Sequence, residues 1–132
     1  MSLNLNLRRC LLLGLLLQPA FALADSEISF RQQVLPILLR ECTYCHMREE
    51  NYGYLVIEDE NSWHNLIGVP AYELPTMKRI EPGDPANSYV WLKLTRQHLE
   101  AGGSGWMMPF HPLSKPDLGV IYNWIEQGAR NN

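Results

Sequence analysis

The chain has 132 residues, with 14 acidic and 11 basic side chains and a formal net charge of −3. This acidic balance argues against a nucleic-acid-binding protein, which needs a basic face. The length favours a single domain with one modest core.

The first 24 residues have the pattern of a secretory signal peptide. Residues 8–9 are basic, residues 10–17 are apolar, and residues 22–24 give the small-x-small pattern of a cleavage site. The apolar stretch is far shorter than the about twenty residues that a membrane-spanning helix needs. We therefore expect cleavage after Ala24, export to the periplasm, and a mature domain over residues 25–132 that is more acidic and holds no disulfide.

Residues 25–41 are predicted to form a lead-in segment and a first helix. Ser29, followed three residues later by Gln32, resembles a capping box. Pro36 lies inside the run and should kink the helix or begin a second one. The apolar residues of this segment recur at helical spacing: Phe30, Val34, Ile37 and Leu38.

This helix leads into the pentapeptide Cys42-Thr43-Tyr44-Cys45-His46. Two cysteines separated by two residues and followed by histidine are the attachment signature of c-type haem. The spacing lets both sulfurs reach the vinyl groups on one porphyrin edge, and His46 then lies under the ring as the proximal iron ligand. A redox dithiol would sit in an alternating strand–helix pattern, and a structural zinc site would need a second Cys/His pair. The sequence has neither pattern and predicts one covalently bound haem c.

The middle of the chain is predicted to be largely irregular, with short helices. Residues 47–61 are polar and include an acidic run, so we expect a solvated loop. Asn61 or Ser62 is placed to cap a short helix. Residues 80–85 contain Pro-Gly and Asp-Pro pairs, which predict a turn, and a helix of about ten residues should follow over residues 86–95.

A second axial ligand is expected from a loop that can fold over the other haem face. The glycine-rich residues 102–105 supply a flexible loop, and Pro109 favours an extended conformation for the residue before it. We therefore favour Met108 as the distal iron ligand, with Met107 as the second choice and a histidine or an open site as the remaining alternatives. The histidines outside the haem motif are expected at the surface or in loops. The residues of this sequence that could serve as the second axial ligand are Met47, Met77, Met107, Met108, His64, His98 and His111.

The last helix should begin at Ser114, whose side chain is a good N-cap, with Asp117 reaching back as in a capping box. Gly128 is a suitable C-terminal stop. The sequence shows no internal repeat and no sustained strand alternation, so the predicted class is mostly α, a small single-domain fold whose helices wrap around one haem. The buried stripe of this helix is expected to hold Leu118, Ile121, Trp124 and Ile125.

The chain resembles the small exported bacterial monohaem cytochromes c, a class I-type family. The resemblance implies an all-α haem fold in which N- and C-terminal helices cross near the haem edge, with Cys42 and Cys45 binding haem, His46 proximal and Met108 distal. The middle segment is longer than in the smallest members, and Phe110 stands where many relatives have a second proline. The stretches that carry the resemblance are 34–38 with 42–46, 65–70, 80–85 with 88–89, and 108–109 with 124–129.

The expected function is periplasmic electron transfer rather than catalysis. The expected partners are redox proteins, with no nucleic acid and no membrane anchor in the mature chain. One alternative is a haem-based sensor, in which a small gas displaces the distal ligand. Another is an electron-transfer subunit of a larger oxidoreductase that turns over substrate on a different chain. Aromatic residues available to the haem pocket are Tyr89, Trp91, Trp106, Tyr122 and Trp124.

Overall fold

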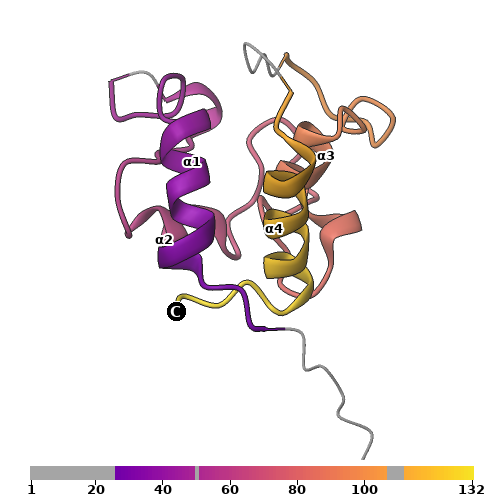
Figure 1. Cartoon of the computed structure of the whole chain (residues 1–132). Helices are drawn as coiled ribbons and strands as arrows, with labels where there is room; N and C mark the ends of the chain where they lie inside the picture. Colours follow the sequence, from indigo (N-terminus) through magenta and orange to yellow (C-terminus); the bar gives the residue numbers. More distant parts are fainter. Residues whose placement is uncertain (1–25, 50, 107–111) are drawn as a thin grey trace, which may run out of the picture.

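A computed structural model describes residues 26–49, 51–106 and 112–132. Over these residues the protein is mostly helical and forms no sheet, and its only extended pairings are isolated bridges such as Ile67 with Ile80. Figure 1 shows α1 and α2 on one side of the molecule and α3 and α4 on the other. Within the described ranges, no helix has the length and apolar character needed to cross a membrane.

The predicted first helix consists of two helical pieces joined end to end. A π-helical turn, η1 (Phe30–Val34), runs directly into α1 (Leu35–Glu41). The Ser29 hydroxyl accepts a hydrogen bond from the backbone N–H of Gln32 (3.2 Å), so the Ser29 half of the predicted capping box is confirmed. The Ser29 N–H in turn donates to Gln33 Oε1 (2.9 Å) and not to Gln32. Pro36 lies in the first turn of α1, where its missing N–H leaves no hydrogen bond unmade. The proline therefore begins a second helix, which is one of the two outcomes expected from the sequence.

The short elements of the middle segment follow the turn chemistry of the sequence. The predicted helix near residue 62 is confirmed as α2 (Ser62–Leu66), and a single 3₁₀ turn, η2 (Tyr52–Tyr54), precedes it. The helix predicted over residues 86–95 is divided into the 3₁₀ turn η3 (Pro85–Asn87) and α3 (Tyr89–Leu94).

Ser88 explains this division. Its backbone is extended (φ −99°, ψ 112°), and its hydroxyl donates to the Asp84 carbonyl (2.8 Å) while accepting from the Glu81 N–H (2.9 Å). The residue is fully buried. A serine that bonds the backbone of the preceding turn competes with the helical ladder, and the chain bends there.

The last helix, α4 (Lys115–Glu126), has the predicted start. The Ser114 hydroxyl accepts from the Asp117 N–H (3.2 Å) and also donates to the Asp117 carboxylate (2.8 Å). Gly128 adopts φ +98°, the left-handed conformation typical of a residue that ends a helix. Ile121, Trp124 and Ile125 are buried, whereas Leu118 is only partly buried.

The core joins the beginning of the described chain to its end. Phe30 of η1 stacks on Trp124 of α4 with ring centroids 5.3 Å apart, and both side chains are almost fully buried. At the opposite end of the two helices, Arg40 pairs with Asp117 at 2.9 Å. The α1 and α4 helices thus run in opposite directions, as Figure 1 shows.

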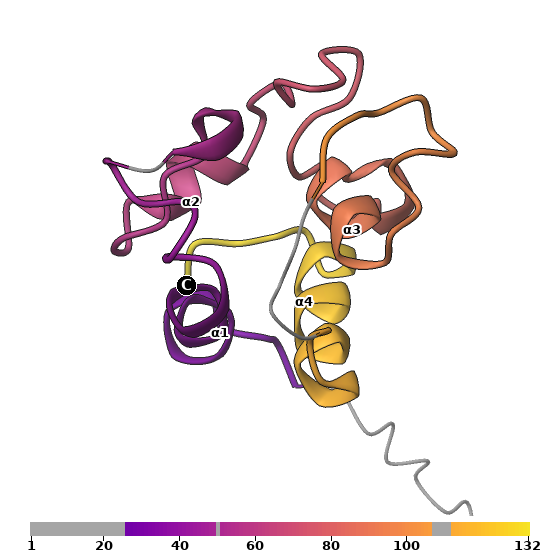
Figure 2. The same ribbon diagram turned by 90° about the horizontal axis from the view of Figure 1, so that it is seen from above.

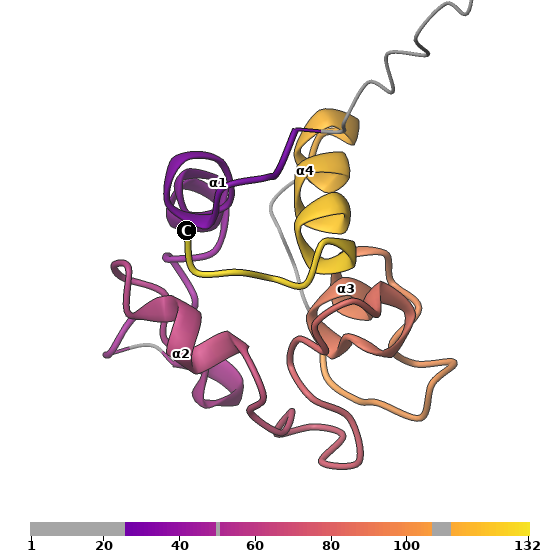
Figure 3. The ribbon, with the colours of Figure 1, turned by 90° about the horizontal axis from the view of Figure 1, so that it is seen from below.

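The segment after α4 crosses from α4 to α1 and α2 (Figures 2 and 3). Two indole N–H groups hold it: Trp63 donates to the Ala129 carbonyl (2.8 Å), and Trp124 donates to the Arg130 carbonyl (2.9 Å). The Arg31 N–H donates to the carbonyl of Asn132 (3.0 Å). These bonds close one end of the molecule and leave the other end for the site described next.

Candidate haem-binding site

The pentapeptide of residues 42–46 forms a tight turn directly after α1. The Cys42 carbonyl accepts hydrogen bonds from the N–H groups of Cys45 (3.2 Å) and His46 (3.1 Å). The turn is fastened to the following segment, because the Thr43 hydroxyl donates to the Ile57 carbonyl (3.1 Å) and the Ile57 N–H donates to the His46 carbonyl. This geometry turns Cys42, Cys45 and His46 toward one cavity, which all three line.

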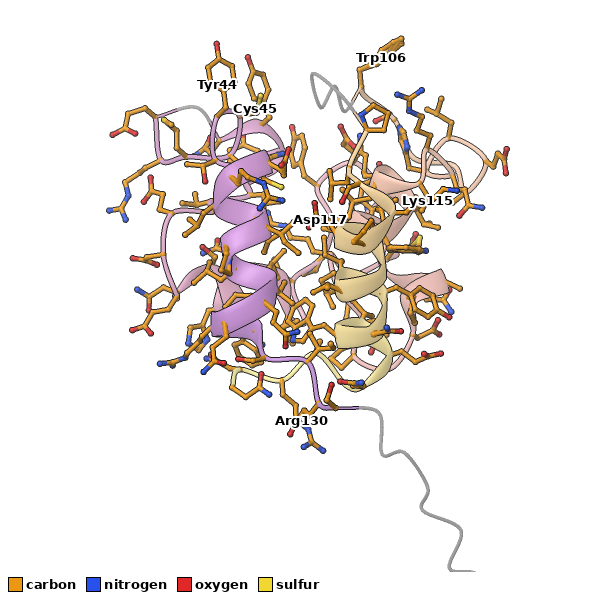
Figure 4. The ribbon with its side chains drawn as sticks, in the orientation of Figure 1. Tyr44, Cys45, Trp106, Lys115, Asp117 and Arg130 are labelled. Atoms are coloured by element: carbon orange, nitrogen blue, oxygen red, sulfur yellow. The ribbon has the colours of Figure 1, made fainter. Side chains whose placement is uncertain are left out.

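That cavity has a volume of about 520 Å³, within the range typical of small-molecule and cofactor pockets. Its wall is mostly apolar, with a few charged groups. Figure 4 shows Cys45 and Trp106 at the same end of the molecule, on opposite sides. Besides the pentapeptide, the apolar residues of the wall are Leu38, Leu55, Ile57, Leu66, Ala71, Val90, Leu94 and Leu113, and the charged ones are Glu41, Glu73, Arg79 and Lys93.

The two cysteines are not joined by a disulfide, and each is partly buried. Burial raises the pKa of the Cys42 thiol to about 12, and the negative charge of Glu41 adds to the effect. Reactive redox thiols have depressed pKa values because the thiolate is the nucleophile. The raised pKa of Cys42 therefore does not favour it as an attacking redox thiol.

His46 is held in a form suited to binding a metal. Burial lowers the pKa of its imidazole, and Arg79 and Lys93 lower it further, although backbone groups of Tyr52 and Leu55 oppose the change. A histidine must be neutral to ligate a metal ion. Its Nδ1 atom is buried and has no hydrogen-bond partner in the described chain.

Arg79 is buried, with 7% of its surface exposed, and lies in the cavity wall. Its guanidinium donates to the carbonyls of Asn65 (2.8 Å), Gly53 (3.0 Å) and Tyr54 (2.8 Å), which ties the end of α2 to η2. Burial lowers the pKa of Arg79. No carboxylate of the described residues lies within ion-pair distance of Arg79, although the cavity wall also holds Glu41 and Glu73.

The remaining predicted ligands are distributed as follows. Met108 and Met107 lie outside the described residues, as does His111. His64 is exposed, as expected. His98 lies in the turn after α3, as expected for a surface or loop residue, but it is buried, with 6% of its surface exposed, and its ring packs edge-on against Tyr89.

Only some of the expected aromatic residues line the cavity. Tyr89 and Trp106 do so. Trp124 instead belongs to the core beside Phe30, and Trp91 packs against Tyr122 with ring centroids 5.2 Å apart. Helical spacing identifies an apolar stripe but does not separate the residues that touch a cavity from those that fill the core.

The sequence reasoning missed Glu73 and Lys93 in the cavity wall. The spacing of Lys93 offered a signal, because it follows Tyr89 by four residues and so shares its helix face. Glu73 lies in an irregular segment before α3, where no periodicity predicts the direction of a side chain. Among the described residues, no three His, Cys, Asp or Glu side chains converge to hold a metal ion by themselves.

Comparisons with protein-family models, with curated proteins and with solved structures found no match to this chain.

Proposed function

We propose that this chain is a c-type cytochrome of the periplasm that carries single electrons between redox proteins. One haem is attached through Cys42 and Cys45, and His46 is the proximal iron ligand. The observation that carries the proposal is that these three side chains, already implied by their spacing, line one apolar cavity of cofactor size.

The chain's own groups suit the attachment chemistry. The haem would supply two vinyl groups, and the thiols of Cys42 and Cys45 would hold it through thioether bonds, a net addition of S–H that needs no oxidant. The Cys42 carbonyl keeps the cysteines on one turn by accepting two backbone hydrogen bonds. The neutral imidazole of His46 has a lone pair available for iron.

The charges around the site favour electron uptake. The bound haem supplies an iron that alternates between the ferrous and ferric states. Arg79 and Lys93 both lower the pKa of His46, but Lys93 is ion-paired with Glu73. Arg79, which has no carboxylate partner among the described residues, is therefore the main source of positive potential at this point. Positive potential and an apolar wall both disfavour the additional charge of ferric iron and therefore raise the reduction potential.

Covalent attachment is the first test. The protein is produced together with a cytochrome c maturation system, and its intact mass is measured. We expect the mass of the chain cut after Ala24 plus one haem, and a pyridine haemochrome spectrum of haem bound through two thioethers. Colour that leaves the chain on acid–organic extraction, or zinc bound in place of haem, would contradict the proposal.

The second axial ligand separates an electron carrier from a gas sensor. We propose Met108 for this position, because the glycine-rich residues before it and Pro109 after it suit a ligand-bearing loop. Met108→Ala should abolish the far-red sulfur-to-iron charge-transfer band, lower the reduction potential, and open ferrous iron to carbon monoxide. Met107→Ala is the matched control and should keep the band, since adjacent residues of an extended segment point in opposite directions.

Each other outcome has a defined meaning. Rapid carbon monoxide binding by the unmodified ferrous protein would favour the sensor. Loss of the band in Met107→Ala, and not in Met108→Ala, would move the ligand by one residue and leave the carrier function intact. Stable co-purification with a catalytic chain would favour the role of an oxidoreductase subunit.

A further inference from the structure

A polar cluster lies in the cavity wall opposite the pentapeptide. Glu73 precedes α3 in the chain, whereas Tyr89 and Lys93 lie on α3 itself. The Tyr89 hydroxyl donates to Glu73 Oε2 at 2.7 Å, and Lys93 Nζ forms an ion pair with the same oxygen. The Lys93 side chain is only 11% exposed and that of Glu73 only 24% exposed. The three side chains thus form hydrogen bonds and an ion pair with one another in a largely buried position. Removing one of them there leaves a polar partner unpaired.

The same groups hold the chain segment that follows. Lys93 Nζ donates to the Ser104 carbonyl at 2.8 Å, and the Tyr89 hydroxyl lies 3.4 Å from that oxygen. His98, buried in the turn after α3, has Nε2 3.2 Å from the Gly105 carbonyl. Because a carbonyl only accepts, this nitrogen carries the hydrogen. Consecutive carbonyls, those of Ser104 and Gly105, therefore receive hydrogen bonds from this side of the cavity.

The glycines of the segment permit this close approach. A Cβ at Gly103 would lie 2.5 Å from the Tyr89 hydroxyl and 2.8 Å from the His98 carbonyl. A Cβ at Gly105 would overlap the Glu73 carboxylate, and this glycine also has φ +73°. Glycines thus flank Ser104, whose carbonyl accepts from Lys93, and the lack of a Cβ at these two positions lets the segment approach the cluster closely.

We propose that Glu73, Tyr89, Lys93 and His98 are positioning residues that fix residues 103–106 along the rim of the haem cavity. They thereby set how readily a small molecule reaches the iron. The inference rests on the proposed haem function. Trp106, the last residue of the segment, lines the cavity while 76% of its surface is exposed, so the position of this segment decides how the cavity is bounded on that side.

The test uses two near-isosteric variants, Tyr89→Phe and Glu73→Gln. Matched controls come from the Tyr122–Glu126 pair on α4, whose hydroxyl-to-carboxylate hydrogen bond of 3.3 Å lies outside the cavity wall. The controls are Tyr122→Phe and Glu126→Gln. Gly105→Ala is a third test variant; if it does not fold, the two near-isosteric variants still decide the question.

The first readout is the rate of backbone amide hydrogen exchange of residues 103–106, measured on the protein as purified, with or without bound haem. The Gly103 N–H donates to the His98 carbonyl at 2.8 Å and is a direct probe. Loss of one net hydrogen bond should raise local opening, and hence exchange, about fivefold. The second readout is the carbon monoxide binding rate of the ferrous protein, measured with Met108→Ala added to every variant so that the iron is open; this rate should rise by a similar factor. Both controls should behave like the unmodified protein.

The outcomes separate this inference from the proposed function. Unchanged exchange in both test variants overturns the positioning role, whether or not haem is bound. Faster exchange with an unchanged carbon monoxide binding rate keeps the positioning role but overturns the claim that the segment limits access to the iron. A chain that carries no haem overturns the proposed function, while the exchange measurement still decides whether the cluster positions the segment.

Discussion

Arg79 illustrates how one residue serves both the fold and the site. Its three hydrogen bonds to carbonyls of residues 53, 54 and 65 hold together segments that have little regular structure of their own. A guanidinium has five N–H donors, so Arg79 can donate further hydrogen bonds besides the three to these carbonyls. In the proposed cytochrome, its remaining capacity and its charge suit the carboxylate of a haem propionate.

Arg79→Gln should lower the reduction potential. The substitution removes a positive charge from the cavity wall, so ferric iron becomes less unfavourable. A charge near the site at an effective dielectric constant of about 20 contributes on the order of 1 kcal/mol, which is about 40 mV for one electron. Spectroelectrochemical titration measures the change.

Two further variants interpret that result. Arg79→Lys keeps the positive charge, so its reduction potential should stay close to that of the unmodified protein. Arg130→Gln removes an exposed arginine that pairs with Glu27 outside the cavity wall and should change little. Equal potentials for Arg79→Gln and the unmodified protein would show that the Arg79 charge does not act on the iron.

At the scale of the element, α4 depends on its first turn. Ser114 satisfies one of the N–H groups that no helical carbonyl can reach, and Asp117 places a negative charge near the helix N-terminus. Arg40 of α1 pairs with the same aspartate, so the cap also joins α4 to the end of α1. Asp117 therefore takes part both in the cap at the start of α4 and in the contact between α4 and α1.

Ser114→Ala should lower the free energy of unfolding by about 1 kcal/mol, the usual effect of removing such a cap. Ser114→Asp should restore most of it, because a carboxylate also accepts the hydrogen bond from the Asp117 N–H. Denaturant titration followed by circular dichroism measures both. Full stability of Ser114→Ala would mean that the cap does not hold this helix, and an equal loss in Ser114→Asp would point to repulsion from Asp117.

At the scale of the whole molecule, the cavity lies between the two halves of a small protein. The cavity, with a mostly apolar wall and a volume of about 520 Å³, is large for a chain of 132 residues, which has only a modest core. Without a bound group, the mostly apolar wall of this cavity faces solvent and contributes little burial to a domain whose stability is small in any case.

The double variant Cys42→Ala/Cys45→Ala, made without haem, should therefore be largely unfolded or molten. We expect weak near-ultraviolet circular dichroism, strong dye binding to exposed apolar surface, and no cooperative melting transition. The holoprotein is the reference. Cooperative melting of the double variant near the holoprotein temperature would show that haem is not part of the core.

The sequence was sufficient where a local rule acts on neighbouring residues. The caps at Ser29 and Ser114 follow from hydrogen bonds within a few positions, and Pro36 gives one of the two outcomes that its backbone restriction allows. The short helix at Ser62 forms without the expected cap, because Asn61 makes no side-chain cap hydrogen bond. The division of the helix near Ser88 was missed, because that serine also bonds residues of the preceding turn.

For the site, the spacing of Cys42, Cys45 and His46 determined the prediction of haem, because one turn of chain places all three side chains. The wall facing them was decided only by the tertiary structure. Glu73, Arg79 and Lys93 come from segments that are apart in the sequence, and no local pattern tells which distant side chains will share a cavity. His98 shows the same point, because its buried ring contacts Tyr89 and the Gly105 carbonyl, neither of which is adjacent to it in the sequence.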